Sequence, residues 1–163
     1  MLLVIALTGC SHSYYVVRHA EKAQLTNGNI MSSPNDPPLS EAGKERAEAL
    51  KDALQHRHIR YIFSTHTVRT ISTVAPLSNA IGVQPDIYGP APDAAFISHL
   101  KLLRKNVLVV GHSNTVDDIV NGLCNTVKVN GDLPDAEYDN LFVITYKGKK
   151  ILFKRKHYGR PAH

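Results

Sequence analysis

The stretch Val107-Leu108-Val109-Val110-Gly111-His112 indicates the fold of this chain more clearly than any other. Four consecutive branched apolar residues are typical of a strand that is buried on both faces, as in a parallel sheet. Two more apolar runs have the same form, Tyr14-Tyr15-Val16-Val17 and Arg60-Tyr61-Ile62-Phe63. Segments with helical periodicity lie between the three runs. Strands that alternate with helices predict an α/β domain with a mostly parallel sheet.

The helix after the first run begins at Ser40, which has the position of an N-cap. Gly43, Ala47, Leu50 and Leu54 follow at helical spacing, with Lys and Glu on the other faces. We predict further helices at about 67–80, 94–103 and 115–123, further strands at 83–88, 141–146 and 151–156, and a loop over 22–39.

The length and composition fit one folded domain. With 163 residues and 43% hydrophobic residues, the chain is neither disordered nor fibrous. Its formal net charge of +5 suits anionic ligands without naming them. The cations between 147 and 160 lack the interleaved aromatic residues of a single-strand binder, so no nucleic-acid partner is expected. We interpret them as a solvated hairpin face, or as a face toward acidic head groups if a membrane anchor lies nearby.

Each of the three apolar runs leads directly into basic residues. Arg18-His19 follows the first run, residues 64–69 follow the second, and Gly111-His112 follows the third. The carboxyl ends of parallel strands lie along one edge of a sheet, and ligands bind in the crevice there. We therefore expect two Arg and two His side chains to converge on one pocket. The donor forks of Arg suit a phosphate group.

The residues around these strand ends resemble the histidine phosphatase superfamily, also called phosphoglycerate mutase-like. Four segments carry the resemblance in the family order, and together they span most of the chain from Tyr14 to about Gly159. It implies a three-layer sandwich around a mostly parallel sheet, with a minimal cap because the short chain leaves little room for an insertion. Many members of the family have Gly at the position of Ala20. In having Ala there, the chain resembles the small branch that includes phosphohistidine phosphatases. The segments are Val16-Val17-Arg18-His19-Ala20-Glu21-Lys22, Pro38-Leu39-Ser40-Glu41-Ala42-Gly43, Ser64-Thr65-His66-Thr67-Val68-Arg69-Thr70 and Val109-Val110-Gly111-His112-Ser113-Asn114-Thr115.

By this resemblance, His19 is the nucleophile and becomes phosphohistidine before water releases the phosphate. Arg18 and Arg69 neutralise the oxygens on which the transition state spreads its charge. His112 donates a hydrogen bond to the phosphoryl group, and the backbone N–H of Ser113 adds another donor. No metal or cofactor is expected for this hydrolysis of a phosphomonoester or phosphoamidate.

A proton donor for the leaving group is expected to be a carboxyl group with a raised pKa. Glu21, two residues after the nucleophile, is one candidate, although it could instead pair with a nearby cation. Asp93, after the third predicted strand, lies roughly where relatives place an acid, but it could also be a helix N-cap. Of these two carboxyl groups, Asp93 is slightly favoured over Glu21 as the proton donor.

Two other functions fit parts of the same pattern. A phosphoglycerate mutase would return the phosphoryl group to its substrate, which favours a more enclosed pocket than this chain can build. A non-catalytic module that binds phosphorylated ligands would not need a nucleophile. The expected partner is a small phosphorylated substrate or a phosphoprotein, and the sequence leaves the oligomeric state open.

The first residues suggest a location in the cell. Leu7-Thr8-Gly9-Cys10 resembles the lipobox of bacterial lipoproteins, in which the signal is cut before a lipidated Cys. The preceding apolar run is too short to span a bilayer, and no Lys or Arg precedes it. We predict a signal remnant and tether over 1–13, a phosphatase domain over 14–163, and lipidation of Cys10 in the cell envelope. If the run is a buried strand and not a signal, the chain is cytoplasmic.

Overall fold

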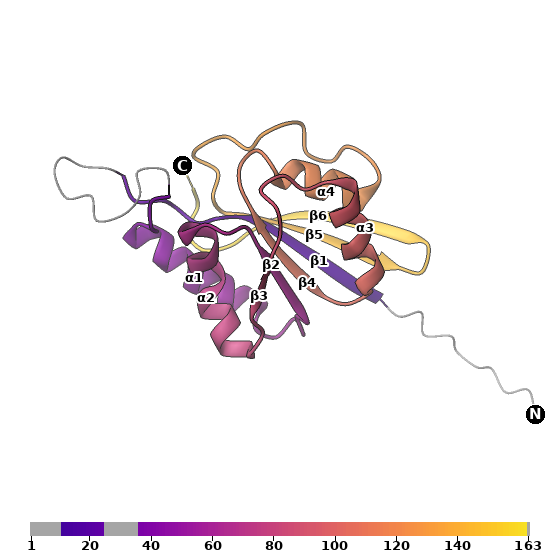
Figure 1. Cartoon of the computed structure of the whole chain (residues 1–163), viewed down its shortest axis with the longest axis horizontal. Helices are drawn as coiled ribbons and strands as arrows, with labels where there is room; N and C mark the ends of the chain where they lie inside the picture. Colours follow the sequence, from indigo (N-terminus) through magenta and orange to yellow (C-terminus); the bar gives the residue numbers. More distant parts are fainter. Residues whose placement is uncertain (1–10, 25–35, 163) are drawn as a thin grey trace, which may run out of the picture.

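One mixed sheet forms the centre of the computed structural model, which describes residues 11–24 and 36–162 (Figure 1). The strand order is β3-β2-β4-β1-β5-β6. The first four of these are mutually parallel, while β5 and β6 run antiparallel to their neighbours. The predicted α/β class with a mostly parallel sheet is confirmed. The strands are β1 (Ser11–Arg18), β2 (Tyr61–Ser64), β3 (Pro85–Ile87), β4 (Val107–Gly111), β5 (Asn140–Lys147) and β6 (Lys150–His157).

The helices cover both faces of this sheet, as the three-layer prediction requires. α1 (Glu41–Leu54) and α2 (Val68–Ile81) pack on one face, around Leu50, Leu77 and Val110. α3 (Ala94–Leu103) and α4 (Val116–Cys124) pack on the other. Successive residues of β1 and β4 point to opposite faces, so their all-apolar sequences feed both cores at once. None of the helices in the described ranges has the length and apolar character needed to cross a membrane.

β1 begins earlier than the apolar pattern predicts. Ser11, His12 and Ser13 extend it and pair with Lys147, Tyr146 and Thr145 of β5. The backbone N–H of Ser13 also donates to Asn106 Oδ1 at 2.8 Å. These polar residues, expected in the tether, therefore belong to the sheet. Residues 1–10, including Cys10, lie outside the described ranges, so the predicted lipidation stays a prediction.

Candidate active site

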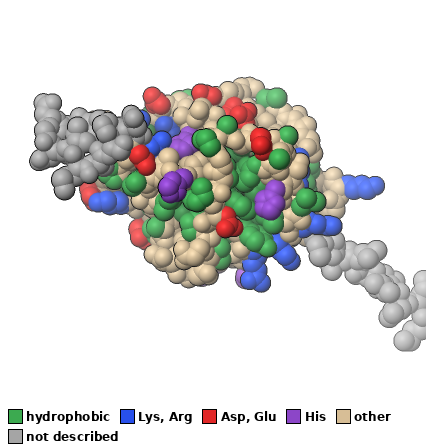
Figure 2. All heavy atoms as spheres, in the orientation of Figure 1, with side chains coloured by type: hydrophobic (Ala, Val, Ile, Leu, Met, Phe, Trp, Pro, Cys, Tyr) green, Lys and Arg blue, Asp and Glu red, His purple; other side chains and the backbone are tan. Residues whose placement is uncertain are grey.

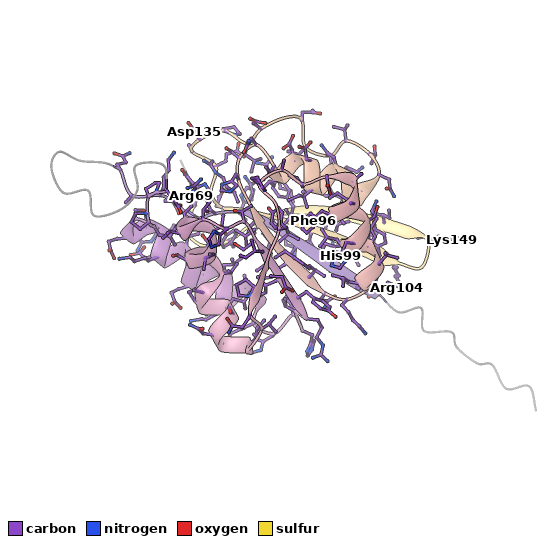
Figure 3. All side chains as sticks on the ribbon, in the orientation of Figure 1. Arg69, Phe96, His99, Arg104, Asp135 and Lys149 are labelled. Atoms are coloured by element: carbon purple, nitrogen blue, oxygen red, sulfur yellow. The ribbon has the colours of Figure 1, made fainter. Side chains whose placement is uncertain are left out.

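The predicted strand-end pocket is present at the carboxyl ends of β1, β2 and β4. It is a cavity of about 630 Å³, and Figure 3 shows two of its lining residues, Arg69 and Asp135, at this end of the fold. All four core residues of the predicted site line it, although they come from three separate strand ends. The lining residues are Arg18, His19, Lys22, Ala23, Gln24, Pro37, Arg69, Pro90, His112, Ser113, Asn114 and Asp135.

His19 is held in one tautomer at the end of β1. Its backbone N–H continues the parallel ladder by donating to the Gly111 carbonyl at 2.9 Å. Its Nδ1 lies 2.8 Å from the Ala20 carbonyl, which can only accept, so Nδ1 carries the proton of the neutral ring. The lone pair is therefore on Nε2, the nitrogen that is free to attack.

The surroundings of His19 keep its ring neutral. The residue is 4% exposed, and its pKa is lowered to about 3, chiefly by burial. The Ala20 hydrogen bond opposes this lowering, and repulsion from Arg18, Arg69 and His112 contributes to it. A neutral imidazole with a defined tautomer is what a histidine nucleophile needs near neutral pH.

His112 lies beside His19, with ring centroids 5.4 Å apart. Its Nε2 lies 2.8 Å from Thr65 Oγ1, and that hydroxyl in turn donates to Thr70 Oγ1 at 3.1 Å. Nε2–H is thus the donor, and Nδ1 carries the lone pair. The pKa of His112 is lowered to about 4, chiefly by burial and then by Arg69 and Arg18, while Asp36 opposes the shift. The ring is neutral before any ligand binds.

Arg69 on α2 lines the cavity and contacts Asp36 and His112. Its Nη1 donates to Asp36 Oδ1 at 2.9 Å, and its Nη2 lies 3.4 Å from His112 Nδ1. The second carboxylate oxygen of Asp36 accepts the backbone N–H of Val68 at 2.8 Å. Asp36 therefore joins the loop before α1 to the first turn of α2 and fixes the direction of the guanidinium.

Arg18 is anchored on the opposite wall. Its side chain is 3% exposed, and Nη1 donates to the carbonyls of Pro134 at 2.9 Å and Asp135 at 3.2 Å. The ring of Tyr138 lies under the guanidinium, with Cζ 4.1 Å from its centroid. The Nε atom is buried and has no hydrogen-bond partner within the described part of the chain. A buried N–H without an acceptor is costly, and a bound anion in the cavity would supply one.

Small residues and threonines hold the strand ends in this arrangement. A side chain at Gly43 would overlap the carbonyl oxygen of Glu21, so α1 packs against the chain just after the nucleophile. A side chain at Gly111 would meet Thr115 Oγ1 at 2.7 Å. Thr73 Oγ1 accepts the backbone N–H of Ala20 at 2.9 Å and donates to the Arg69 carbonyl at 2.7 Å. The glycines in the two motifs are therefore explained by close backbone packing.

The two predicted proton donors do not line the cavity. Glu21 faces away from it and accepts Arg46 Nε at 2.8 Å through Oε1 and at 2.9 Å through Oε2. Asp93 is the N-cap of α3, where Oδ1 accepts the Phe96 N–H at 2.7 Å. Glu21 thus pairs with a nearby cation and Asp93 caps a helix, and the assignment of either carboxyl as the acid stays a prediction.

Ser113 lines the cavity, but its position differs slightly from the prediction. α4 begins at Val116 with Thr115 at the N-cap position, so Ser113 lies in the turn before the helix and not at its start. Its carbonyl accepts the Leu133 N–H at 2.9 Å, which ties this turn to the loop that holds Arg18.

Several residues that shape the site carry little signal of their role in the sequence, although Thr65 directly follows the end of β2. Thr65 and Thr73 act through hydroxyl groups, and threonine is too common to signal a role. Asp36, Asp135 and Tyr138 lie in loops without periodicity. A charge signal existed only for Asp36, because a lone carboxylate precedes the Pro-Pro-Leu-Ser stretch.

Paired His and Arg side chains at the strand ends of an α/β fold suit a phosphate-binding class of protein. Comparison with known proteins indicates which family within this class the chain resembles. Residues 14–88 match the sequence model of the histidine phosphatase superfamily, branch 1. The match covers a little under half of the chain, and it agrees with the resemblance that the motifs predict.

Solved structures share the fold over nearly its whole length. A protein histidine phosphatase SixA complexed with tungstate is 16% identical with a TM-score of 0.68, covering 89% of this chain and 96% of that one. A mycobacterial glucosyl-3-phosphoglycerate phosphatase is 13% identical, with a TM-score of 0.62 and coverage of 91% and 98%. A phosphoglycerate mutase from Bacillus anthracis is 16% identical, with a TM-score of 0.55 and coverage of 92% and 93%. No curated protein sequence matches the chain.

Proposed function

We propose that this chain is a phosphatase that forms a phosphohistidine intermediate on His19 and needs no metal ion. The observation that carries the proposal is the neutral, single-tautomer imidazole of His19 between the guanidinium groups of Arg18 and Arg69. Attack by Nε2 on phosphorus forms the N–P bond and breaks the bond to the leaving group. Water then attacks the same phosphorus, and His19 leaves as the neutral ring.

Charge neutralisation in this mechanism comes from side chains of the cavity. The loose transition state of phosphoryl transfer spreads its charge over the equatorial oxygens, and positioned guanidinium groups stabilise that charge by ~10³-fold or more in rate. Arg18 offers an Nε–H that no other described residue accepts, and Arg69 offers a guanidinium fixed by Asp36. These are the roles that bound cations fill in other phosphoryl-transfer sites.

We assign the substrate to the phosphoamidate class, such as phosphohistidine in a protein. Neither Glu21 nor Asp93 reaches the cavity, and the carboxyl that does line it within the described residues, Asp135, is fully exposed. An imidazole leaving group needs less proton donation than an alkoxide, so a site with a weakly held acid favours it. The protein histidine phosphatase among the structural neighbours supports the same class.

The test is phosphate release with a chelator present, on p-nitrophenyl phosphate and on a phosphohistidine peptide. His19→Asn is the matched variant, because its amide N–H can still donate to the Ala20 carbonyl while the nucleophile is lost. A rapid quench in alkaline detergent with radiolabelled substrate then asks whether label stays on the native chain as an adduct that is stable in base and lost in acid. Turnover that survives in His19→Asn would rule out this nucleophile. Faster release from the ester than from the peptide would reject the phosphoamidate assignment.

A further inference from the structure

The end of the fold opposite the active site carries a group of unpaired cations. They come from three separate loops and turns, all are exposed, and none forms an ion pair with another described residue. We call this set the basic pole. Its members are Arg57, Arg60, Arg104, Lys105, Lys147, Lys149 and Lys150.

Hydrogen bonds and strand register place these residues together. Asn106 links three segments of the chain. Its side chain accepts the Ser13 N–H and donates to the Arg57 carbonyl at 2.7 Å. Its own carbonyl accepts the Arg60 N–H at 2.8 Å. In the neighbouring hairpin, Lys147 pairs with both Ser11 and Lys150. Figure 3 shows Arg104 and Lys149 at the same end of the molecule, away from Arg69 and Asp135.

No acidic residue in the same segments offsets this positive charge. The contributing segments 57–61, 104–107 and 147–150 contain no Asp or Glu. Several cations elsewhere are paired, such as Lys44 with Glu41 and Arg155 with Glu137, although Lys128, Lys154 and Lys156 form no ion pair with another described residue. Figure 2 shows Lys and Arg side chains projecting from the right and lower edges of the body. Leu102, two residues before Arg104, is 79% exposed, which adds an apolar side chain to the same end.

The chain enters the fold at this pole. β1 begins at Ser11 beside Lys147, so the ten preceding residues join the domain here (Figure 1). Seven of them, Met1 to Leu7, are apolar in sequence. An apolar sequence that leads into a polybasic surface is a combination that holds a protein on an anionic bilayer, since a single weak anchor is not enough.

We propose that the basic pole docks on anionic phospholipid head groups. β1 runs from the pole to the catalytic end, and its eight residues span roughly 25 Å at strand rise. Docking at the pole therefore leaves the His19 cavity facing away from the membrane and open to a phosphorylated partner in solution. The proposal does not depend on phosphatase activity or on lipidation of Cys10.

The experiment is co-sedimentation of the full chain with vesicles of phosphatidylcholine alone or mixed with phosphatidylglycerol. We expect binding to the mixed vesicles to exceed binding to phosphatidylcholine and to weaken at high salt. Lys149→Glu with Lys150→Glu should lower the partition coefficient by about 30-fold, or roughly fivefold for each lysine removed. Arg60→Glu with Lys105→Glu, on other segments of the pole, should lower it similarly.

The matched control is Lys154→Glu with Lys156→Glu. These exposed lysines are on the same hairpin but pair with Val143 and Leu141, nearer the catalytic end, so the net charge changes equally. Circular dichroism and the thermal midpoint check that every variant is folded. An equal loss in the control would show a net-charge effect and overturn the proposal. So would equal binding to both vesicle types, or tighter binding to duplex DNA that the pole variants abolish.

Discussion

Arg69 Nη2 and His112 Nδ1 lie 3.4 Å apart, a donor facing the lone pair of a neutral ring. The single N–H of the ring, on Nε2, is directed to Thr65, so His112 in this state does not offer a proton to a phosphoryl oxygen from Nδ1. The hydrogen bond that the family resemblance implies from His112 therefore requires a second proton on the ring. A dianionic phosphate beside Arg69 would supply the attraction that holds that proton.

We expect phosphate binding to raise the pKa of His112 well above its ligand-free value of about 4. The measurement is an NMR titration of the imidazole signals with and without inorganic phosphate. The exposed His56 and His66 serve as internal references, because neither lines the cavity. An unchanged His112 titration in saturating phosphate would show that the ring does not donate from Nδ1.

The depressed pKa of His19 predicts how stability changes with pH. The folded state holds this ring neutral down to about pH 3, whereas the unfolded chain protonates it near 6.5. The unfolded state therefore binds more protons between these values, and the free energy of unfolding falls as the pH falls. From pH 7 to pH 5, His19 alone should remove about 2 kcal/mol.

Urea unfolding of the native chain and of His19→Asn at both pH values isolates this contribution. Carboxylates and other histidines titrate in both proteins and largely cancel in the difference. The native chain should lose about 2 kcal/mol more than the variant. Equal losses would mean that His19 titrates normally in the folded protein.

Most of the fold follows from the apolar pattern, and its limits have a physical cause. Val107 to Val110 is apolar on both faces because helices cover both, so the sequence alone reveals β4. Ser11 to Ser13 have no such pattern, because their place in β1 depends on hydrogen bonds to β5 and Asn106. β3 has three residues, of which two are exposed, so its bounds were predicted too widely.

The candidate site also has one part that the sequence predicts and one part that it does not. His19, Arg18, Arg69 and His112 could be predicted to meet because topology brings parallel strand ends to one edge. The direction of a carboxylate could not be predicted. Glu21 is two residues from the nucleophile, yet Arg46, 25 residues away on α1, determines where it points.

The Glu21–Arg46 pair predicts a separation of stability from catalysis. Arg46 is buried, and Glu21→Gln would leave its charge without a counterion. We expect a loss of about 2 kcal/mol in the free energy of unfolding, with kcat within a few-fold of native. Glu41→Gln, in the exposed pair with Lys44, is the control and should cost less than about 0.5 kcal/mol. A large loss of kcat in Glu21→Gln at native stability would restore Glu21 as the acid.

Asp135 lines the cavity, and its Oδ1 lies 3.7 Å from Arg18 Nη2. If the site donates a proton to a poor leaving group, this carboxyl is the one placed to do so. We expect Asp135→Asn to lower kcat by about 10²-fold on an alkyl phosphate but only slightly on p-nitrophenyl phosphate or a phosphohistidine peptide, whose leaving groups need less help.

Asp93→Ala is the matched control for Asp135, because it removes a carboxyl that was also predicted as the acid but does not line the cavity. Loss of the α3 cap should lower the free energy of unfolding by about 1 kcal/mol and leave kcat on all three substrates unchanged. The pattern across substrates then separates two roles for Asp135. A loss confined to the alkyl phosphate assigns proton transfer, whereas an equal loss on every substrate shows that Asp135 acts by positioning Arg18, since a weakened clamp slows every phosphoryl transfer alike.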